Sequence, residues 1–121
     1  MPIPSAGSKF ITHVVDLDTT NDTDVYVVPN NFSSHVEHVF ITNSAGGNSN
    51  YDLKYYEKAV NVTHTLFLNH QISSKSIEHL FTMDKPLYLH AGDKLIVAAD
   101  TADVLHVGIS AEEHFDPAHT T

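Results

Sequence analysis

The sequence predicts an all-β domain, an antiparallel and jelly-roll-like β-sandwich of about eight strands. Short apolar runs recur at intervals of roughly 8–12 residues, and Gly, Asn, Asp and Pro residues separate them. No segment sustains the apolar period of a helix. The pattern is clearest from Pro86 to Glu113, where the turns Ala91–Asp93 and Asp100–Asp103 divide three apolar runs. This segment has no room for a helix.

The first three predicted strands are rich in β-branched and aromatic residues, which favour extended structure. Lys9–Asp16 (KFITHVVD) ends before a polar turn, and Asp24–Val28 (DVYVV) stops at the following Pro-Asn-Asn. His35–Thr42 (HVEHVFIT) runs into the loop Asn43–Asn50, whose Gly and Asn residues are typical of a loop tip. Alternation along this third strand places Val39 and Ile41 on one face, and Val36, His38 and Phe40 on the other.

The remaining strands follow the same logic. The region from His70 to Phe81 is the best helical candidate, but its three serines and the missing cap pattern favour a strand or an extended connection. The predicted strands after the loop are Tyr51–Lys58, Val62–Leu68, Lys75–Thr82, Leu87–His90, Leu95–Ala99 and Val104–Ile109. We expect one sandwich domain over residues 9–115, a flexible N-terminal arm over residues 1–8 and a C-terminal tail over residues 116–121.

Composition excludes several classes of function. The chain of 121 residues has a net charge of -9 with neutral histidine, and its six basic residues are all lysines that form no patch. Such a surface repels phosphate backbones, so we expect no nucleic-acid partner. The chain has no cysteine, which excludes disulfides and thiolate zinc sites. No apolar run approaches the ~18 residues of a membrane helix, and we expect no membrane partner.

Histidine is the feature that invites an enzyme interpretation. His35 and His38 are three residues apart, so on a strand they should point to opposite faces. A metal site built from separate strands, such as His64 with His79 or His106, stays open. Neither HxH nor HExxH occurs, and surface histidines or a pH-responsive interface are the alternatives. The ten histidines are His13, His35, His38, His64, His70, His79, His90, His106, His114 and His119.

Other candidate chemistry is also weak. The turn Gly92-Asp93 resembles that of the cupin family, but the paired histidines of the cupin metal motif are missing. There is no GxSxG nucleophile motif, and the adjacent Glu112 and Glu113 should face apart on a strand. We therefore expect no catalytic residue, no cofactor and no metal site. Three tyrosines beside the Asn43–Asn50 loop, namely Tyr51, Tyr55 and Tyr56, could form a glycan-binding platform.

The order of the motifs resembles small all-β virion proteins of tailed bacteriophages. The matching stretches together cover about residues 9–113. They are the VYVVP of Val25–Pro29, the VFITN of Val39–Asn43, the LKYY of Leu53–Tyr56 and the LYLHAGDKLIV of Leu87–Val97. These motifs are turns and strand patterns, and the resemblance implies a virion structural protein.

The resemblance implies a capsid decoration (cement) protein, made in the host cytoplasm, that binds and stabilises the phage head as a symmetric oligomer. Its expected partners are copies of itself, with a trimer favoured, and the major capsid protein or other virion proteins. A neck or tail component is the alternative within this class. A carbohydrate-binding sandwich and a cupin-like metalloprotein are the alternatives from other classes. The interface residues we expect are Ile3, Phe10, Asn43, Gly46, Gly47 and Asn50.

Overall fold

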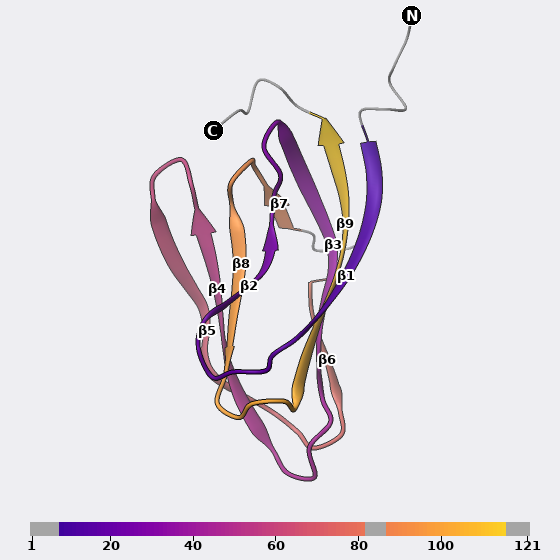
Figure 1. The fold of residues 1–121 in the computed structure, drawn as a ribbon, viewed down its shortest axis with the longest axis vertical. Helices are drawn as coiled ribbons and strands as arrows, with labels where there is room; N and C mark the ends of the chain where they lie inside the picture. The colour runs from indigo at the N-terminus through magenta and orange to yellow at the C-terminus, as the bar shows by residue number, and fades with distance from the viewer. Residues whose placement is uncertain (1–7, 82–86, 116–121) are drawn as a thin grey trace, which may run out of the picture.

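The computed structural model describes residues 8–81 and 87–115. These residues form nine strands in two antiparallel sheets that pack face to face (Figure 1). The predicted all-β antiparallel sandwich is therefore confirmed. The described residues contain no helix long and apolar enough to cross a membrane. The expected arm, the expected tail and Ile3 lie outside the described residues, apart from Ser8.

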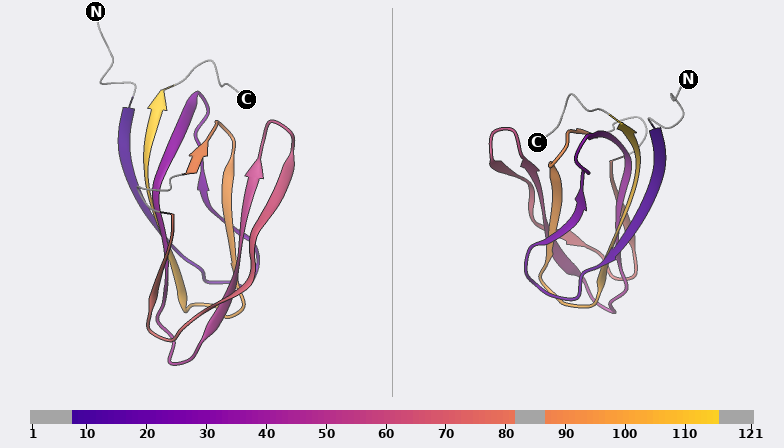
Figure 2. Two further views of the ribbon diagram at one scale, coloured as in Figure 1. Left: turned by 180° about the vertical axis from the view of Figure 1, so that it is seen from behind. Right: turned by 45° about the horizontal axis from the view of Figure 1, so that its top comes forward.

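Each sheet combines strands from both halves of the chain. In sheet A the order is β1 (Ser8–Asp16), β9 (Leu105–Phe115), β3 (Phe32–Asn43) and β6 (Ile77–Phe81), and β7 (Leu87–Leu89) also pairs with β3. In sheet B the order is β2 (Thr23–Val27), β8 (Lys94–Ala99), β4 (Ser49–Glu57) and β5 (Val62–Ile72). The two sheets and the connections between their strands are visible in the views of Figure 2.

The predicted strands match the observed ones, with differences at their ends. β3 begins at Phe32, β5 continues to Ile72 and β9 continues to Phe115. β6 begins at Ile77, later than predicted, because Lys75 adopts a positive φ of 53° that an extended strand does not allow. These boundaries differ from the predicted ones because the strand ends carry polar and charged residues, which are not part of an apolar run.

The core lies between the two sheets and is built from alternate residues of the central strands. On β9, the inward side chains are buried, while the outward residues between them, apart from Gly108, are at least partly exposed, as the period of two requires. β4 and β8 show the same alternation on the opposite sheet. The largest side chains that are fully buried include Tyr51, Leu17, Ile41, Leu53, Ile72, Leu89, Leu95, Leu105 and Ile109.

A β-bulge in β3 changes which residues face the core. The register with β9 shifts between Val36 and His38, so Glu37 is an extra residue and the alternation reverses at this point. Val36 is buried together with Val39 and does not share the outer face with His38. The prediction for Val36 was wrong for this reason. The expectation that His35 and His38 point to opposite faces was wrong for the same reason.

The Gly92-Asp93 turn closes one end of the sandwich. Gly92 has a φ of 85°, and a Cβ there would lie 2.9 Å from Cγ of Lys58. The buried Asp93 carboxylate accepts hydrogen bonds from the backbone N–H groups of Lys58 and His90, each at 2.9 Å. It also accepts one from the Tyr55 hydroxyl at 3.3 Å. The turn thus fastens the β7–β8 connection to the β4–β5 hairpin.

Candidate functional site

The outer face of sheet A carries five of the nine histidines that lie among the described residues. The register aligns their strands so that the outward residues of β3, β6 and β9 lie side by side. Between His38 and His79 the ring nitrogens Nε2 and Nδ1 are 2.7 Å apart, so one ring donates a hydrogen bond to the other. The histidines of this face are His35, His38, His79, His106 and His114.

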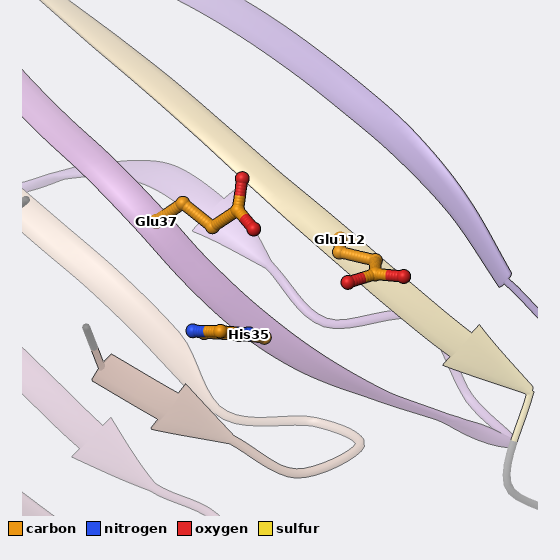
Figure 3. A group of neighbouring side chains, drawn as sticks. All are labelled: His35, Glu37 and Glu112. Atoms are coloured by element: carbon orange, nitrogen blue, oxygen red, sulfur yellow. The ribbon is translucent and has the colours of Figure 1, made fainter. Parts of the chain in front are cut away.

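Three of the outward side chains form a compact cluster of His35, Glu37 and Glu112 (Figure 3). His35 and Glu112 are direct partners across the β3–β9 pair, and the bulge turns Glu37 towards the same face. One nitrogen or oxygen atom from each residue lies within 4.8 Å of the others. Imidazole and carboxylate are ligand types that divalent metals accept. The Glu112 carboxylate is already held at 2.7 Å by the Ser8 hydroxyl, which donates to it.

The cross-strand metal sites considered from the sequence do not form. His64 lies on sheet B, 3.2 Å from a carboxylate oxygen of Glu57. His106 lies on sheet A, with its Nδ1 2.7 Å from an Asp16 oxygen. His79 pairs with His38, as described above. Among the described residues, only the cluster of His35, Glu37 and Glu112 brings three possible ligand groups together.

Large apolar side chains stand beside this cluster on the same face. Phe10 of β1 is 74% exposed and Val14 of the same strand is 63% exposed. Tyr88 of β7, 66% exposed, stacks on the ring of His35 with centroids 4.7 Å apart. Most surface apolar residues of soluble proteins occur singly, so a group on one sheet face suggests a contact surface.

A glycine allows one aromatic ring to lie flat against the same face. Phe40 stands opposite Gly108 on the β3–β9 pair. A Cβ at Gly108 would lie only 2.0 Å from Cζ of Phe40, which means that the ring occupies the place of a side chain. Phe40 covers Gly108 and remains only partly exposed.

The residues expected at an interface lie at two different ends of the sandwich. Phe10 is near the start of β1, whereas the loop with Gly46 and Gly47 joins β3 to β4 at the opposite end (Figure 1). Both glycines are exposed, and a Cβ at either would meet no atom within 4 Å. Asn50 is partly buried on β4 and donates a hydrogen bond to the Asn69 side chain at 3.0 Å. These positions form no single surface.

Asn43 has a structural place in this loop. The residue is 2% exposed, and its side-chain amide nitrogen lies 3.0 Å from the carbonyl oxygen of Gly47. The same nitrogen is 3.2 Å from the carbonyl oxygens of Ile72 and Ser73. The side-chain carbonyl accepts a hydrogen bond from the Ala45 backbone N–H at 2.9 Å. The Asn43 side chain therefore holds the loop in its conformation, and it is too buried to contact a partner molecule.

A buried polar network, which the sequence did not reveal, closes the end of the sandwich near Phe10. Glu113 is 3% exposed and accepts a hydrogen bond of 2.6 Å from the hydroxyl of buried Tyr26. Lys9, its partner on β1, places Nζ 3.6 Å from the same carboxylate, and Ser34 lies 2.9 Å from the tyrosine hydroxyl. Burial, followed by the hydrogen bond to Glu113, raises the pKa of Tyr26 above its ordinary value. Glu112 and Glu113 do face apart, as expected from their spacing.

The three tyrosines do not form the glycan platform considered from the sequence. Tyr51 is 1% exposed and belongs to the core, so its ring cannot stack on a sugar. Tyr55 packs partly buried against the core, and burial together with the nearby charge of Asp93 raises its pKa to about 12. Only Tyr56 of the three lies outside the core cluster and its packed neighbours, and its hydroxyl donates to Asn61.

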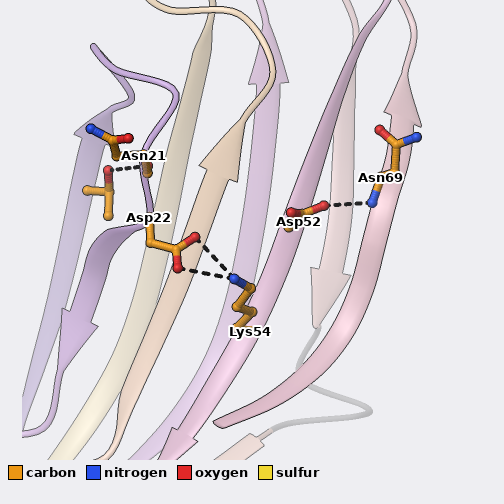
Figure 4. Close-up of polar contacts among 6 residues, drawn as sticks. Asn21, Asp22, Asp52, Lys54 and Asn69 are labelled. Carbon is orange, nitrogen blue, oxygen red and sulfur yellow. Dashed lines mark hydrogen bonds and ion pairs between the residues drawn. The ribbon is translucent and has the colours of Figure 1, made fainter.

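Small polar contacts cover part of sheet B instead (Figure 4). The Lys54 ammonium donates to both oxygens of Asp22, at 3.1 and 3.2 Å, and so ties β4 to the turn before β2. An Asp52 oxygen accepts the backbone N–H of Asn69 at 2.7 Å. These contacts pair the polar groups with one another within the chain.

Comparison with known proteins supports the fold. No family model matches the sequence, and no characterised protein is similar to it in sequence at a significant level. Among solved structures, the Bacillus endospore appendages, a novel family of disulfide-linked pili, match with a TM-score of 0.53. That match has 7% identity and covers 91% of this chain and 89% of that chain.

Viral proteins are also among the structural matches. The icosahedral IBDV viral particle matches with a TM-score of 0.51 and 8% identity, over 93% of this chain and 33% of that chain. A pentameric capsid protein isolated from metagenomic phage sequences is 16% identical over 98% of this chain and 68% of that chain. Its TM-score of 0.38 is too low to support an inference. At such identities the first two matches show a shared fold.

Proposed function

We propose that this chain is a non-enzymatic structural protein of a virion, and specifically a capsid decoration protein that acts as a symmetric oligomer. The observation that carries the proposal is the set of large apolar side chains exposed on the strands of an acidic sandwich. Three of them share the outer face of sheet A and are between 63% and 74% exposed, and they are Phe10, Val14 and Tyr88. Such side chains are best explained by contacts with other protein molecules.

The strand order is consistent with this role. β1 lies beside β9 in one sheet and β2 beside β8 in the other, so strands from the two ends of the chain pair with one another. We propose that this nesting forms a jelly roll, an architecture of viral capsid domains and also of lectins and cupins. The fold likeness to the IBDV particle supports the viral use by analogy. Among the functions of jelly rolls we favour the structural one, because the surface of this chain offers apolar contact area.

The net charge and the size of the interface that each copy needs also fit a decoration protein. A net charge of -9 suits a position outside the capsid, away from packaged nucleic acid. Each copy needs only a modest interface, since symmetry repeats the same contact over the shell. Buried apolar area contributes roughly 25 cal/mol per Å², less the cost of association. Many equal contacts of this kind resist pressure that acts on the head from inside.

The proposal is tested by adding the purified protein to heads that lack it. We expect saturable co-sedimentation with many copies per head, and a higher temperature for head rupture after binding. A small ring at one vertex would instead indicate the neck or tail location. The proposal is wrong if the protein neither binds such heads nor occurs in purified particles by quantitative mass spectrometry.

A further inference from the structure

We propose that the free edge of β1 joins two copies of this chain, which pair antiparallel about Thr12 and so form one continuous sheet from two copies of sheet A. The strand lies along one side of the sandwich, with β9 as its neighbour in the sheet (Figure 2). No backbone hydrogen bond joins its other edge to any described residue. This inference names the contact that the oligomer of the proposed function would use, and to that extent it rests on that function.

β1 is the only long and regular edge among the described strands. Its nine residues pair with β9 without any shift of register. The other edge strands are either interrupted by a shift or very short. β5 contains two shifts, β2 and β6 have five residues with one shift each, and β7 has three residues. Bulges and shortness are the usual protection of an edge against pairing with another chain, and β1 has neither.

The outward side chains of β1 are complementary to themselves. When two copies pair antiparallel with Thr12 opposite Thr12, Phe10 of each copy stands opposite Val14 of the other. These are the two most exposed apolar residues of the strand, at 74% and 63%. Two equal aromatic–β-branched pairs would then cover side chains that water now surrounds. If the register between the two copies shifted by one residue, Phe10 of one copy and Val14 of the other would point to opposite faces of the sheet. Both pairs would then be lost.

Charge favours the same arrangement. β1 carries one lysine and one aspartate, Lys9 near its start and Asp16 at its end. Antiparallel pairing sets the Lys9 end of each strand beside the Asp16 end of the other, whereas parallel pairing would align like charges. The two side chains point to opposite faces of the sheet, so charge sets only the direction of the strands and no ion pair forms between the copies. Two copies of a chain with a net charge of -9 repel one another over most of their surface. A strand with no net charge is a place where this repulsion is small.

Cross-linking tests the pairing directly, because the chain has no cysteine of its own. In the proposed register the Thr12→Cys thiols of two copies face each other at a separation that a disulfide can span. We expect mild oxidation to convert this variant to a covalent dimer at micromolar concentration. Thr65→Cys, also on an exposed edge-strand position, is the matched control and should remain monomeric. Equal cross-linking of the two variants, or none in Thr12→Cys, would overturn the proposal.

A second pair of variants separates this inference from the proposed function. Phe10→Lys should weaken self-association by at least about tenfold in light scattering, whereas Leu68→Lys should not. The two residues are 74% and 73% exposed and both lie on edge strands, so their effects on solubility are matched. If both variants associate like the parent, the β1 contact is wrong, and binding of the parent to heads still decides the function. If the parent associates through β1 but ignores heads, the function is wrong.

Discussion

Replacing Tyr26 by Phe should destabilise the sandwich because it removes the hydrogen bond to a buried carboxylate. The Tyr26 hydroxyl donates to Glu113 at 2.6 Å, and the two residues are only 4% and 3% exposed. Water cannot readily replace the lost donor at this position. Lys9 offers partial compensation, but its Nζ is 3.6 Å away and its side chain is 58% exposed. Most of the hydrogen-bond energy should therefore be lost.

The expected magnitude follows from the charge of the acceptor. Hydrogen bonds to charged groups contribute about 1.5–3 kcal/mol, and the short distance places this bond within that range. We expect Tyr26→Phe to lower the free energy of unfolding by about 2 kcal/mol. In a Glu113→Gln background the acceptor is neutral, and the same change should cost about 1 kcal/mol. The difference measures the coupling between the two side chains.

Urea unfolding is the assay, with an unchanged m-value as evidence that the folded state is intact. Tyr88→Phe is the matched control, because it removes the same atom from a tyrosine that is 66% exposed. That change should stay within about 0.5 kcal/mol of the parent. The reasoning is refuted if Tyr26→Phe costs no more than Tyr88→Phe.

Three further predictions concern other parts of the molecule. Burial raises the pKa of Tyr51 above its ordinary value and that of Tyr55 to about 12. Both groups stabilise the fold below pH ~10, and this contribution is lost as the pH rises further, with a slope of up to about 1.4 kcal/mol per pH unit for each tyrosine. Denaturant titrations at alkaline pH check this, and a flat profile contradicts it. Asn43→Ala should lower the free energy of unfolding by about 2–3 kcal/mol, since buried carbonyl groups lose their donor. Urea unfolding measures it, and a loss below about 0.5 kcal/mol would show that the loop holds without this side chain. Glu37→Gln should raise the free energy of unfolding by a few tenths of a kcal/mol, because it relieves repulsion with Glu112. A fall in the melting temperature of this variant would contradict the assumed repulsion.

Much of the fold could be predicted because strand identity depends on local chemistry. Runs such as Leu95–Ala99 have a dominant local preference for extended structure. The turn at Gly92 and Asp93 needs a positive φ, which Gly92 supplies, and a short side-chain acceptor, which Asp93 supplies. The sandwich then follows from the number and spacing of the strands. Strand ends were less predictable, because polar residues extend β3 and β9 through pairing with each other.

The candidate site could not be predicted in the same way. Its histidines come from β3, β6 and β9, and only the register of these strands brings them to one face. The bulge at Glu37 reverses the alternation of inward and outward side chains on β3. The sequence HVEHVF contains no residue that indicates a bulge. Tyr51 shows a related difficulty, since a tyrosine next to a polar loop can lie on the surface or in the core. It lies in the core, and its hydroxyl donates to Glu78, which is 27 residues away in the sequence.

Cryo-electron microscopy of purified particles that contain this chain tests the central claim most directly. The account predicts density for the sandwich at symmetry-related positions on the outside of the capsid, with exposed apolar side chains such as Phe10 covered by neighbouring protein. Particles with full occupancy of capsid proteins but no density for this chain, or density only inside the shell, would contradict it.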